Sequence, residues 1–128
     1  AGLPLRDGSV DTMLCVFAPR NPAEFARVLR PGGRLVVAQP LPEHLAGLRA
    51  RYGLLGVGEG KTERLGAAFP GWDAASPVEV RRQADLTADE VRDLIAMGPN
   101  AFHGPAGEVH DDEVGIAVEV VVFARPPR

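Results

Sequence analysis

The sequence has little of what marks several large classes of protein. Its single cysteine, Cys15, excludes an intrachain disulfide and a zinc site built on cysteines. No apolar run approaches the ~18 residues that a membrane-spanning helix needs. The first residues have neither the basic region nor the apolar core of a secretion signal. We therefore expect a protein of the reducing cytoplasm, with no membrane partner and no metal site.

An excess of basic charge is also missing. The chain has 14 Lys and Arg against 17 Asp and Glu, which gives a formal net charge of −3 at pH 7. A chain without a global positive field binds RNA only through a local patch or another domain. The candidates for such a patch are Arg49, Arg51 and Arg64, although a solvated charged surface is the commoner explanation of residues like these.

The 128 residues suffice for one compact domain and are few for a complete α/β enzyme. The hydrophobic pattern predicts strands over 10–17, 34–39, 78–84 and 115–124, with a loop over 69–76. It predicts helices after Asn21, after 40–42, over 61–68 and after Thr87. The nearly continuous apolar run of the first strand predicts that both of its faces are covered.

Two helix starts carry clear local signals. Asn21 is an N-cap followed by Pro22 at the first helical position, and Thr87 with Glu90 forms a capping-box pattern. We expect Pro31-Gly32-Gly33 to end the first helix and the next strand to follow it. A strand, a short helix and a strand make a right-handed crossover, so these two strands should be parallel.

This order of elements, with the Arg-Pro-Gly-Gly of 30–33, resembles the C-terminal half of class I S-adenosylmethionine-dependent methyltransferases. Within that superfamily, further segments in combination are similar to the bacterial 23S rRNA (guanine-N1)-methyltransferase family. These segments are Val16-Phe17-Ala18-Pro19, the helix over 23–30, Pro40-Leu41-Pro42-Glu43-His44-Leu45 and Met97-Gly98-Pro99-Asn100-Ala101-Phe102. The family includes enzymes that confer resistance to tylosin-type and mycinamicin-type macrolides.

The resemblance implies an α/β fold, the C-terminal half of a Rossmann-like class I methyltransferase sheet. Parallel strands would be followed by an antiparallel pair whose last strand is inserted into the sheet. Residues 1–128 would then form one partial domain, from the fourth strand onward. The glycine-rich cofactor loop, the acidic residue that holds the ribose hydroxyls, the zinc module and an initiating Met are not in this sequence. We therefore expect a fragment or an excised domain that is inactive by itself.

The resemblance also implies a cofactor site for S-adenosylmethionine. Ligands of open α/β sheets bind at the carboxyl ends of the strands, where the first strand ends in Phe17-Ala18-Pro19. The residues that the resemblance assigns to the cofactor are Ala1, Gly2, Leu3, Phe17, Ala18, Pro19 and His44. His44 is also the candidate for taking the N1 proton of the base. The alternatives are a trimmed loop end for 1–3, a plain turn for 17–19 and a surface histidine.

The expected function is transfer of a methyl group from the sulfonium to guanine N1 of 23S rRNA in the complete enzyme. Such a displacement needs alignment and a dry site more than a covalent nucleophile. Two alternatives stay open. One is a class I methyltransferase that acts on a small molecule, and the other is a non-catalytic remnant or binding module.

In the complete class I sheet the fourth strand pairs with the first. Without that partner, the outer edge of Val10–Phe17 would be bare and apolar, and such edges promote self-pairing. We therefore expect the chain to form a homodimer through this strand, or to be marginally stable. Sedimentation at high concentration measures this, and a stable monomer would contradict it.

Overall fold

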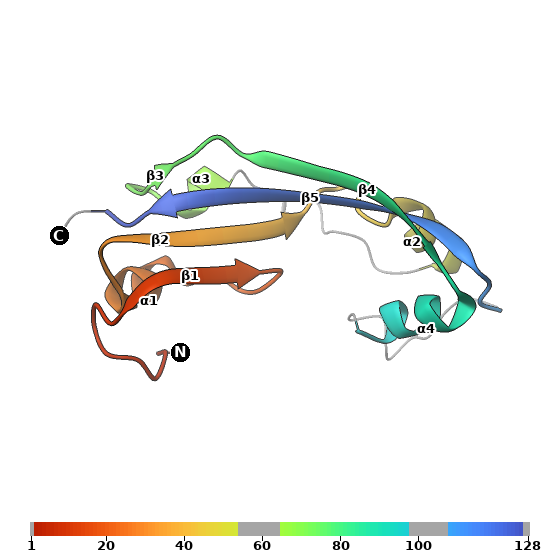
Figure 1. Ribbon diagram of the computed structural model, residues 1–128, viewed down its shortest axis with the longest axis horizontal. Helices are drawn as coiled ribbons and strands as arrows, with labels where there is room; N and C mark the ends of the chain where they lie inside the picture. Colours follow the sequence, from red (N-terminus) through yellow and green to blue (C-terminus); the bar gives the residue numbers. More distant parts are fainter. Residues whose placement is uncertain (1, 54–64, 98–107, 127–128) are drawn as a thin grey trace. The chain divides into compact units, whose positions relative to one another are not determined.

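The computed structural model describes residues 2–53, 65–97 and 108–126. Figure 1 shows the order of the elements, in which strands and helices alternate over the first half of the chain. The elements are β1 (Val10–Val16), α1 (Pro22–Val28), β2 (Leu29–Pro40), α2 (Ala46–Tyr52), α3 (Leu65–Ala68), β3 (Asp73–Ala74), β4 (Val78–Leu86), α4 (Ala88–Met97) and β5 (Asp112–Ala124).

The strands form one five-stranded sheet in the order β1-β2-β5-β3, with β4 also paired to β5. β1 and β2 are parallel, and Cys15 of β1 lies beside Val37 of β2. β3 is antiparallel to β5. The last strand in the sequence therefore lies inside the sheet, and β1 lies at its edge. Both features were predicted, and the parallel β1–β2 pair confirms the crossover.

The chain divides into two compact units. The first unit comprises Ala1–Gln39, Glu63–Glu79 and Glu119–Arg128, and the second comprises Pro40–Thr62 and Val80–Val118. β5 contributes residues to both units. In the part of the chain that the structure describes, no helix is long and apolar enough to cross a membrane.

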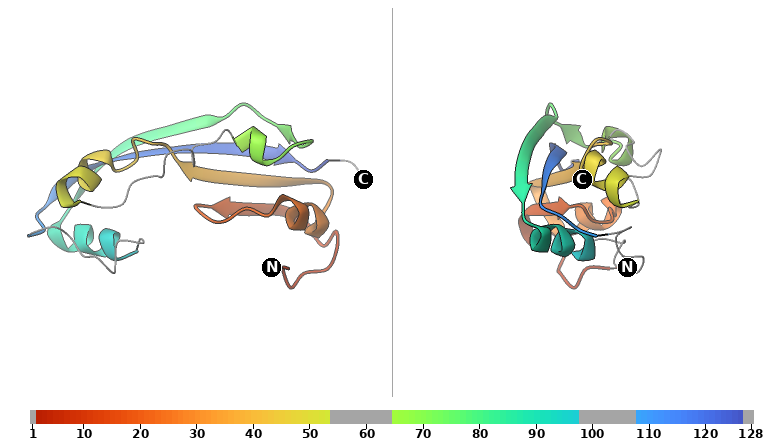
Figure 2. Two further views of the ribbon diagram at one scale, coloured as in Figure 1. Left: turned by 180° about the vertical axis from the view of Figure 1, so that it is seen from behind. Right: turned by 90° about the vertical axis from the view of Figure 1, so that its right-hand side faces the viewer.

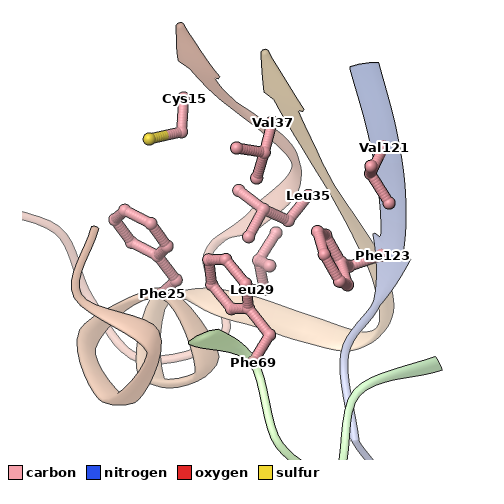
Figure 3. Close-up of a cluster of buried hydrophobic side chains, with 8 residues drawn as sticks. All are labelled: Cys15, Phe25, Leu29, Leu35, Val37, Phe69, Val121 and Phe123. Carbon is pink, nitrogen blue, oxygen red and sulfur yellow. The ribbon is translucent and has the colours of Figure 1, made fainter. Parts of the chain in front are cut away.

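The core of the first unit is built in rows across the sheet. The N–H of Arg125 donates to the carbonyl of Gly33, and this register sets Leu35 opposite Phe123 and Val37 opposite Val121. Figure 3 shows these pairs with the rings of α1 and of the α3 segment packed over them. The eight buried side chains are Cys15, Phe25, Leu29, Leu35, Val37, Phe69, Val121 and Phe123.

The helices of the first unit cover only one face of its strands. Figure 2 shows α1 and α3 on the same side, where Phe69 stacks with Phe25 at a centroid distance of 6.5 Å and contacts Phe123 at 4.7 Å. On the opposite face of β1, Leu14 is 69% exposed and Val16 is 58% exposed. The prediction that both faces of this strand are covered was therefore wrong. A continuous apolar run does not say what packs on each face.

α1 begins as predicted and ends earlier than predicted. The backbone N–H of Glu24 donates to the side chain of Asn21, and Pro22 is the first helical residue. The helix ends at Val28, before the Pro-Gly-Gly segment, because a residue that precedes proline disfavours helical geometry. Residues 30–33 instead form an irregular stretch of β2, since the pairing with β1 shifts between Val10 and Thr12.

The second unit has its own small core. α2 contributes Leu48 and Tyr52, α4 contributes Val91 and Ile95, and Val109 and Val114 complete the cluster. The capping box at the start of α4 is confirmed: the Thr87 hydroxyl accepts from the Glu90 N–H, and the Glu90 carboxylate accepts from the Thr87 N–H.

Boundaries in the rest of the chain also differ from the predictions, and β4 continues to Leu86 while β5 begins at Asp112. α2 starts at Ala46, after a turn in which the His44 N–H donates to Leu41, so 40–42 does not open the helix directly. The expected helix over 61–68 is described only for Leu65–Ala68. The predicted loop over 69–76 contains the short strand β3, whose following residue Ala75 donates from its N–H to Val122.

Two glycines give opposite predictions for a single added methyl group. A Cβ at Gly33 would lie 2.8 Å from the backbone oxygen of Arg30 and 3.2 Å from that of Asp11, whereas a Cβ at Gly47 in α2 meets nothing within 4 Å. We expect Gly33→Ala to lower the free energy of unfolding by about 1–3 kcal/mol. We expect Gly47→Ala to raise it by about 0.5–1 kcal/mol through helix propensity. Urea denaturation measures both, and equal effects of the two variants would contradict the packing described.

Candidate active site

The turn after β1 places an exposed aromatic ring at the carboxyl end of the parallel pair. Phe17 has a φ of +50°, rare for a residue with a side chain, and is 55% exposed. Its N–H donates to the carbonyl of Ala38, which fixes the turn to β2. Below the turn, the Cys15 thiol lies 3.6 Å from the carbonyl oxygen of Ala18 and 3.7 Å from that of Pro19. Burial raises the pKa of Cys15, so this thiol is a structural group rather than a nucleophile.

Three polar side chains meet at the same edge. The Arg20 guanidinium donates to Gln39 Oε1 at 2.6 Å, and Gln39 Nε2 donates to the Glu119 carboxylate at 3.5 Å. Gln39 is only 5% exposed, while Arg20 and Glu119 are partly exposed. We call these three residues the edge cluster. All of them belong to the first unit.

The loop before β1 is held by one guanidinium group. Arg27 of α1 donates to the carbonyl oxygens of Leu3 and Leu5 and to the carboxylates of Asp7 and Glu24. The carbonyl of Arg27 also accepts the N–H of Gly8. Arg27 therefore ties the loop before β1, which contains residues that the resemblance assigns to the cofactor, to the first helix.

Glu24 completes this attachment from the other side. Its Oε1 accepts the backbone N–H of Leu3 at 2.6 Å, so that amide is already used within the protein. Hydrogen bonds from Arg27, then from the Leu3 N–H, lower the pKa of Glu24 to about 2. Ala1, another residue predicted to contact the cofactor, lies outside the described residues.

His44 lies in the second unit and accepts a hydrogen bond. The N–H of Ala117 donates to its Nδ1 at 3.0 Å, so the neutral ring carries its hydrogen on Nε2. Burial and then the positive charge of Arg49 lower the pKa of His44. Taking up a proton on Nδ1 would break the bond to Ala117. The catalytic role of His44 stays a prediction.

The arginines predicted to face RNA make contacts within the second unit. Arg49 donates to the carbonyl oxygens of Pro42 and His44, and thereby holds the turn before α2. Arg51 forms an ion pair with Asp112. Arg64 lies outside the described residues, as does the segment 98–102 that contributed to the resemblance. Among the described residues, no group of three or more His, Cys, Asp or Glu side chains could hold a metal ion.

A shallow groove of about 320 Å³ lies in the second unit. It is lined by Glu43, Arg81, Arg82, Gln83 and residues 115–117, and Arg81 forms an ion pair with Glu43 across it. The groove has no buried polar group aimed into it that would orient a base. It is therefore a weaker candidate than the carboxyl edge of the first unit.

Comparison with known sequences gives three relatives of the same kind. The chain is 43% identical over 108 residues to the 23S rRNA (guanine(748)-N1)-methyltransferase of Streptomyces fradiae, and 44% identical over 102 residues to a proposed 23S rRNA (guanine-N1)-methyltransferase of Micromonospora griseorubida. The chain resembles part of a 23S rRNA (guanine-N1)-methyltransferase. A third relative, the proposed enzyme YxjB of Bacillus subtilis, is 30% identical over 113 residues. No protein-family model matches the sequence.

The matched segments are a minority of these relatives. They cover 84% and 79% of this chain but only 39% and 35% of the Streptomyces and Micromonospora proteins. The chain therefore spans less than two fifths of the length of the curated relatives that it matches.

Solved structures agree on the fold. A candidate methyltransferase of Bacillus halodurans superposes with a TM-score of 0.52 at 16% identity, covering 98% of this chain and 68% of its own. The YcgJ protein of Bacillus subtilis gives a TM-score of 0.54 at 14% identity, covering 99% of this chain and 68% of its own. The predicted fold class, the C-terminal half of a class I methyltransferase sheet, is confirmed.

The sequence reasoning missed the edge cluster and the role of Arg27. One signal for the cluster was present: Leu35, Val37 and Gln39 share one face of β2, so a polar residue continues a buried apolar stripe. On β5, Glu119 likewise interrupts the stripe of Val121 and Phe123. The contacts of Arg27 had no such signal, because they reach residues 20 or more positions away.

Removing the Arg27 guanidinium should release Glu24. In Arg27→Met we expect the pKa of Glu24 to rise from about 2 toward its ordinary 4.5. Because folding lowers this pKa, the stability that Glu24 contributes is present above pH 4.5 and is lost as the pH falls from 4.5 to about 2. The variant should lack that loss. NMR titration of the Glu24 carboxyl measures the shift.

The control for this prediction is Arg92→Met, which removes an exposed ion pair of the same i,i+3 spacing, with Asp89. It should leave the Glu24 titration unchanged. An unaltered Glu24 titration in Arg27→Met would show that the loop is not held as described.

Proposed function

We propose that this chain supplies the C-terminal part of an enzyme that transfers a methyl group from S-adenosylmethionine to N1 of a guanine in 23S rRNA. The observation that carries the proposal is the identity of 43% and 44% to two relatives named for that reaction. The class I fold supports it, since the carboxyl ends of β1 and β2 form the edge at which ligands of such sheets bind.

The residues at this edge fit one side of the cofactor. The exposed ring of Phe17 offers an apolar face, and the Cys15 thiol beneath the turn holds the carbonyls of Ala18 and Pro19. Gly2 and Leu3 lie in the loop that Arg27 and Glu24 hold against α1. The glycine-rich loop and the carboxylate for the ribose are not among the residues of this chain. S-adenosylmethionine, when bound, supplies the methyl group on a sulfonium.

In this proposal, the chain orients the guanine that accepts the methyl group. A direct displacement requires the acceptor nitrogen in line with the methyl group and the exclusion of water. A rigid turn fixed by the bond from Phe17 to Ala38 suits that task. We retain the proposals that His44 contacts the cofactor or the target base and that Arg49, Arg51 and Arg64 contact RNA.

A hybrid enzyme tests the proposed function. This chain would replace the matching 108-residue segment of the Streptomyces fradiae enzyme. We expect the hybrid, given S-adenosylmethionine and 23S rRNA, to form 1-methylguanosine, as measured by mass spectrometry of the digested RNA. The 128-residue chain alone should form none.

The unaltered Streptomyces enzyme is the positive control, and thermal melts of the hybrid show that it is folded. A folded hybrid that binds S-adenosylmethionine but leaves 23S rRNA unmethylated would contradict the proposal. That result would favour a small-molecule acceptor or a non-catalytic binding module.

A further inference from the structure

In the first unit, the paired side chains of β2 and β5 change from apolar to polar at the carboxyl end of β2. Along β2 and β5, the apolar pairs Leu35–Phe123 and Val37–Val121 are followed in the same register by Gln39 and Glu119. A core row would favour apolar side chains here, because burying a polar group costs free energy unless it is hydrogen-bonded. Here Gln39 forms hydrogen bonds with both Glu119 and Arg20. This row is therefore a built polar feature within an otherwise apolar stripe.

The orientation of the Gln39 amide follows from its partners. A guanidinium only donates and a carboxylate only accepts, so Oε1 must face Arg20 and Nε2 must face Glu119. Gln39 is nine-tenths buried, which fixes the amide between the two charged groups. The amide thereby lies between a cation and an anion at the edge, and both charged groups are partly exposed.

A guanine presents the complementary pattern on its Watson–Crick edge. O6 is an acceptor, and N1–H and the N2 amino group are adjacent donors. A guanidinium suits O6, and a carboxylate can accept from N1–H and N2–H together in a bidentate contact. Adenine would set a donor against Arg20 and an unprotonated N1 against Glu119. The edge cluster therefore discriminates between the two purines by charge.

We propose that Arg20, Gln39 and Glu119 form the recognition site for the acceptor guanine, in which Glu119 takes the N1 proton. This inference rests on the proposed function and assigns that function to specific residues. Arg20 donates to O6, Glu119 accepts from N1–H and N2–H, and Gln39 is a positioning residue that holds the two.

The chemical step balances with these groups. The N1 lone pair forms the bond to the methyl carbon, and the bond from carbon to sulfur breaks with its electrons left on sulfur. The N1–H bond breaks as N1 becomes positive, and the proton passes to a Glu119 oxygen. The products are S-adenosylhomocysteine, N1-methylguanine and a protonated carboxyl group, which returns its proton to water. Arg20 stabilises the charge that develops on O6.

Glu119 suits this role better than His44 does. The Nδ1 of His44 already accepts from Ala117, so a proton taken up there would break that hydrogen bond. Among the described residues, Glu119 accepts one hydrogen bond, from the Gln39 amide at 3.5 Å. A carboxylate has room for several donors on its two oxygens.

Nucleotide binding to the 128-residue chain tests the site without requiring activity. GMP should shift the NMR signals of the Gln39 side-chain amide and the Arg20 Nε–H. IMP, which lacks only the N2 amino group, should bind roughly tenfold more weakly, as expected for loss of half of a bidentate contact. The Glu119→Gln variant should bind GMP and IMP with equal affinity. The matched control Asp73→Asn makes the same change at the other end of β5, beside Ala124, and should keep the wild-type preference.

The hybrid enzyme tests the proton transfer. Glu119→Gln should lower kcat for methylation by at least roughly 100-fold, the usual contribution of a general base, while KM for S-adenosylmethionine stays unchanged. Arg20→Lys should lower kcat less than Glu119→Gln does, because the lysine retains one hydrogen-bond donor. A merely structural Glu119 would alter melting and KM and would leave the preference for GMP over IMP intact.

Two results would overturn the inference. The first is an absence of GMP binding, or GMP binding that leaves the Gln39 and Arg20 signals unshifted. The second is full activity of the Glu119→Gln hybrid, including the case in which only His44→Asn abolishes activity. A wild-type hybrid that methylates nothing in 23S rRNA would instead refute the proposed function, while the GMP and IMP titrations would still decide whether the cluster recognises guanine.

Discussion

The pairing of β2 with β5 is the constraint on which the first unit depends. Its register stacks Leu35 on Phe123 and Val37 on Val121, and these pairs form the floor on which Phe25 and Phe69 pack. The same register, continued by one step, brings Gln39 to Glu119 at the end where the parallel strands stop. A single strand alignment therefore produces both the apolar core and the polar edge, and a slip by one residue would lose both.

Local signals predicted much of the fold, since they act over a few residues. Asn21 with Pro22 and Thr87 with Glu90 fixed two helix starts, and the helix between β1 and β2 predicted a parallel pair. The exposed face of β1 and the irregular stretch at 30–33 were not predictable in this way. Exposure depends on which segments pack on a strand, and the stretch depends on close approach of Gly33 to the backbone of a neighbouring strand.

The end of β1 that holds Phe17, Ala18 and Pro19 was predicted, but the polar residues beside it were not. Phe17, Ala18 and Pro19 do lie at the carboxyl end of β1, because the fold class places that strand end there. The partners of Gln39 could not be found from the sequence, since Glu119 lies 80 residues away and Arg20 lies 19 residues away. For His44, the sequence motif suggested a catalytic role, whereas in the structure its Nδ1 accepts a hydrogen bond from the backbone of Ala117.

The most direct test of the proposed site asks where S-adenosylmethionine binds to the chain. We would follow the backbone amide signals of the 128-residue chain by NMR during titration with S-adenosylmethionine. The account predicts saturable shifts confined to the loop at Gly2 and Leu3 and to the edge from Phe17 to Arg20. Saturable shifts confined to the groove at Arg81 and Arg82, with none at Phe17, would contradict it.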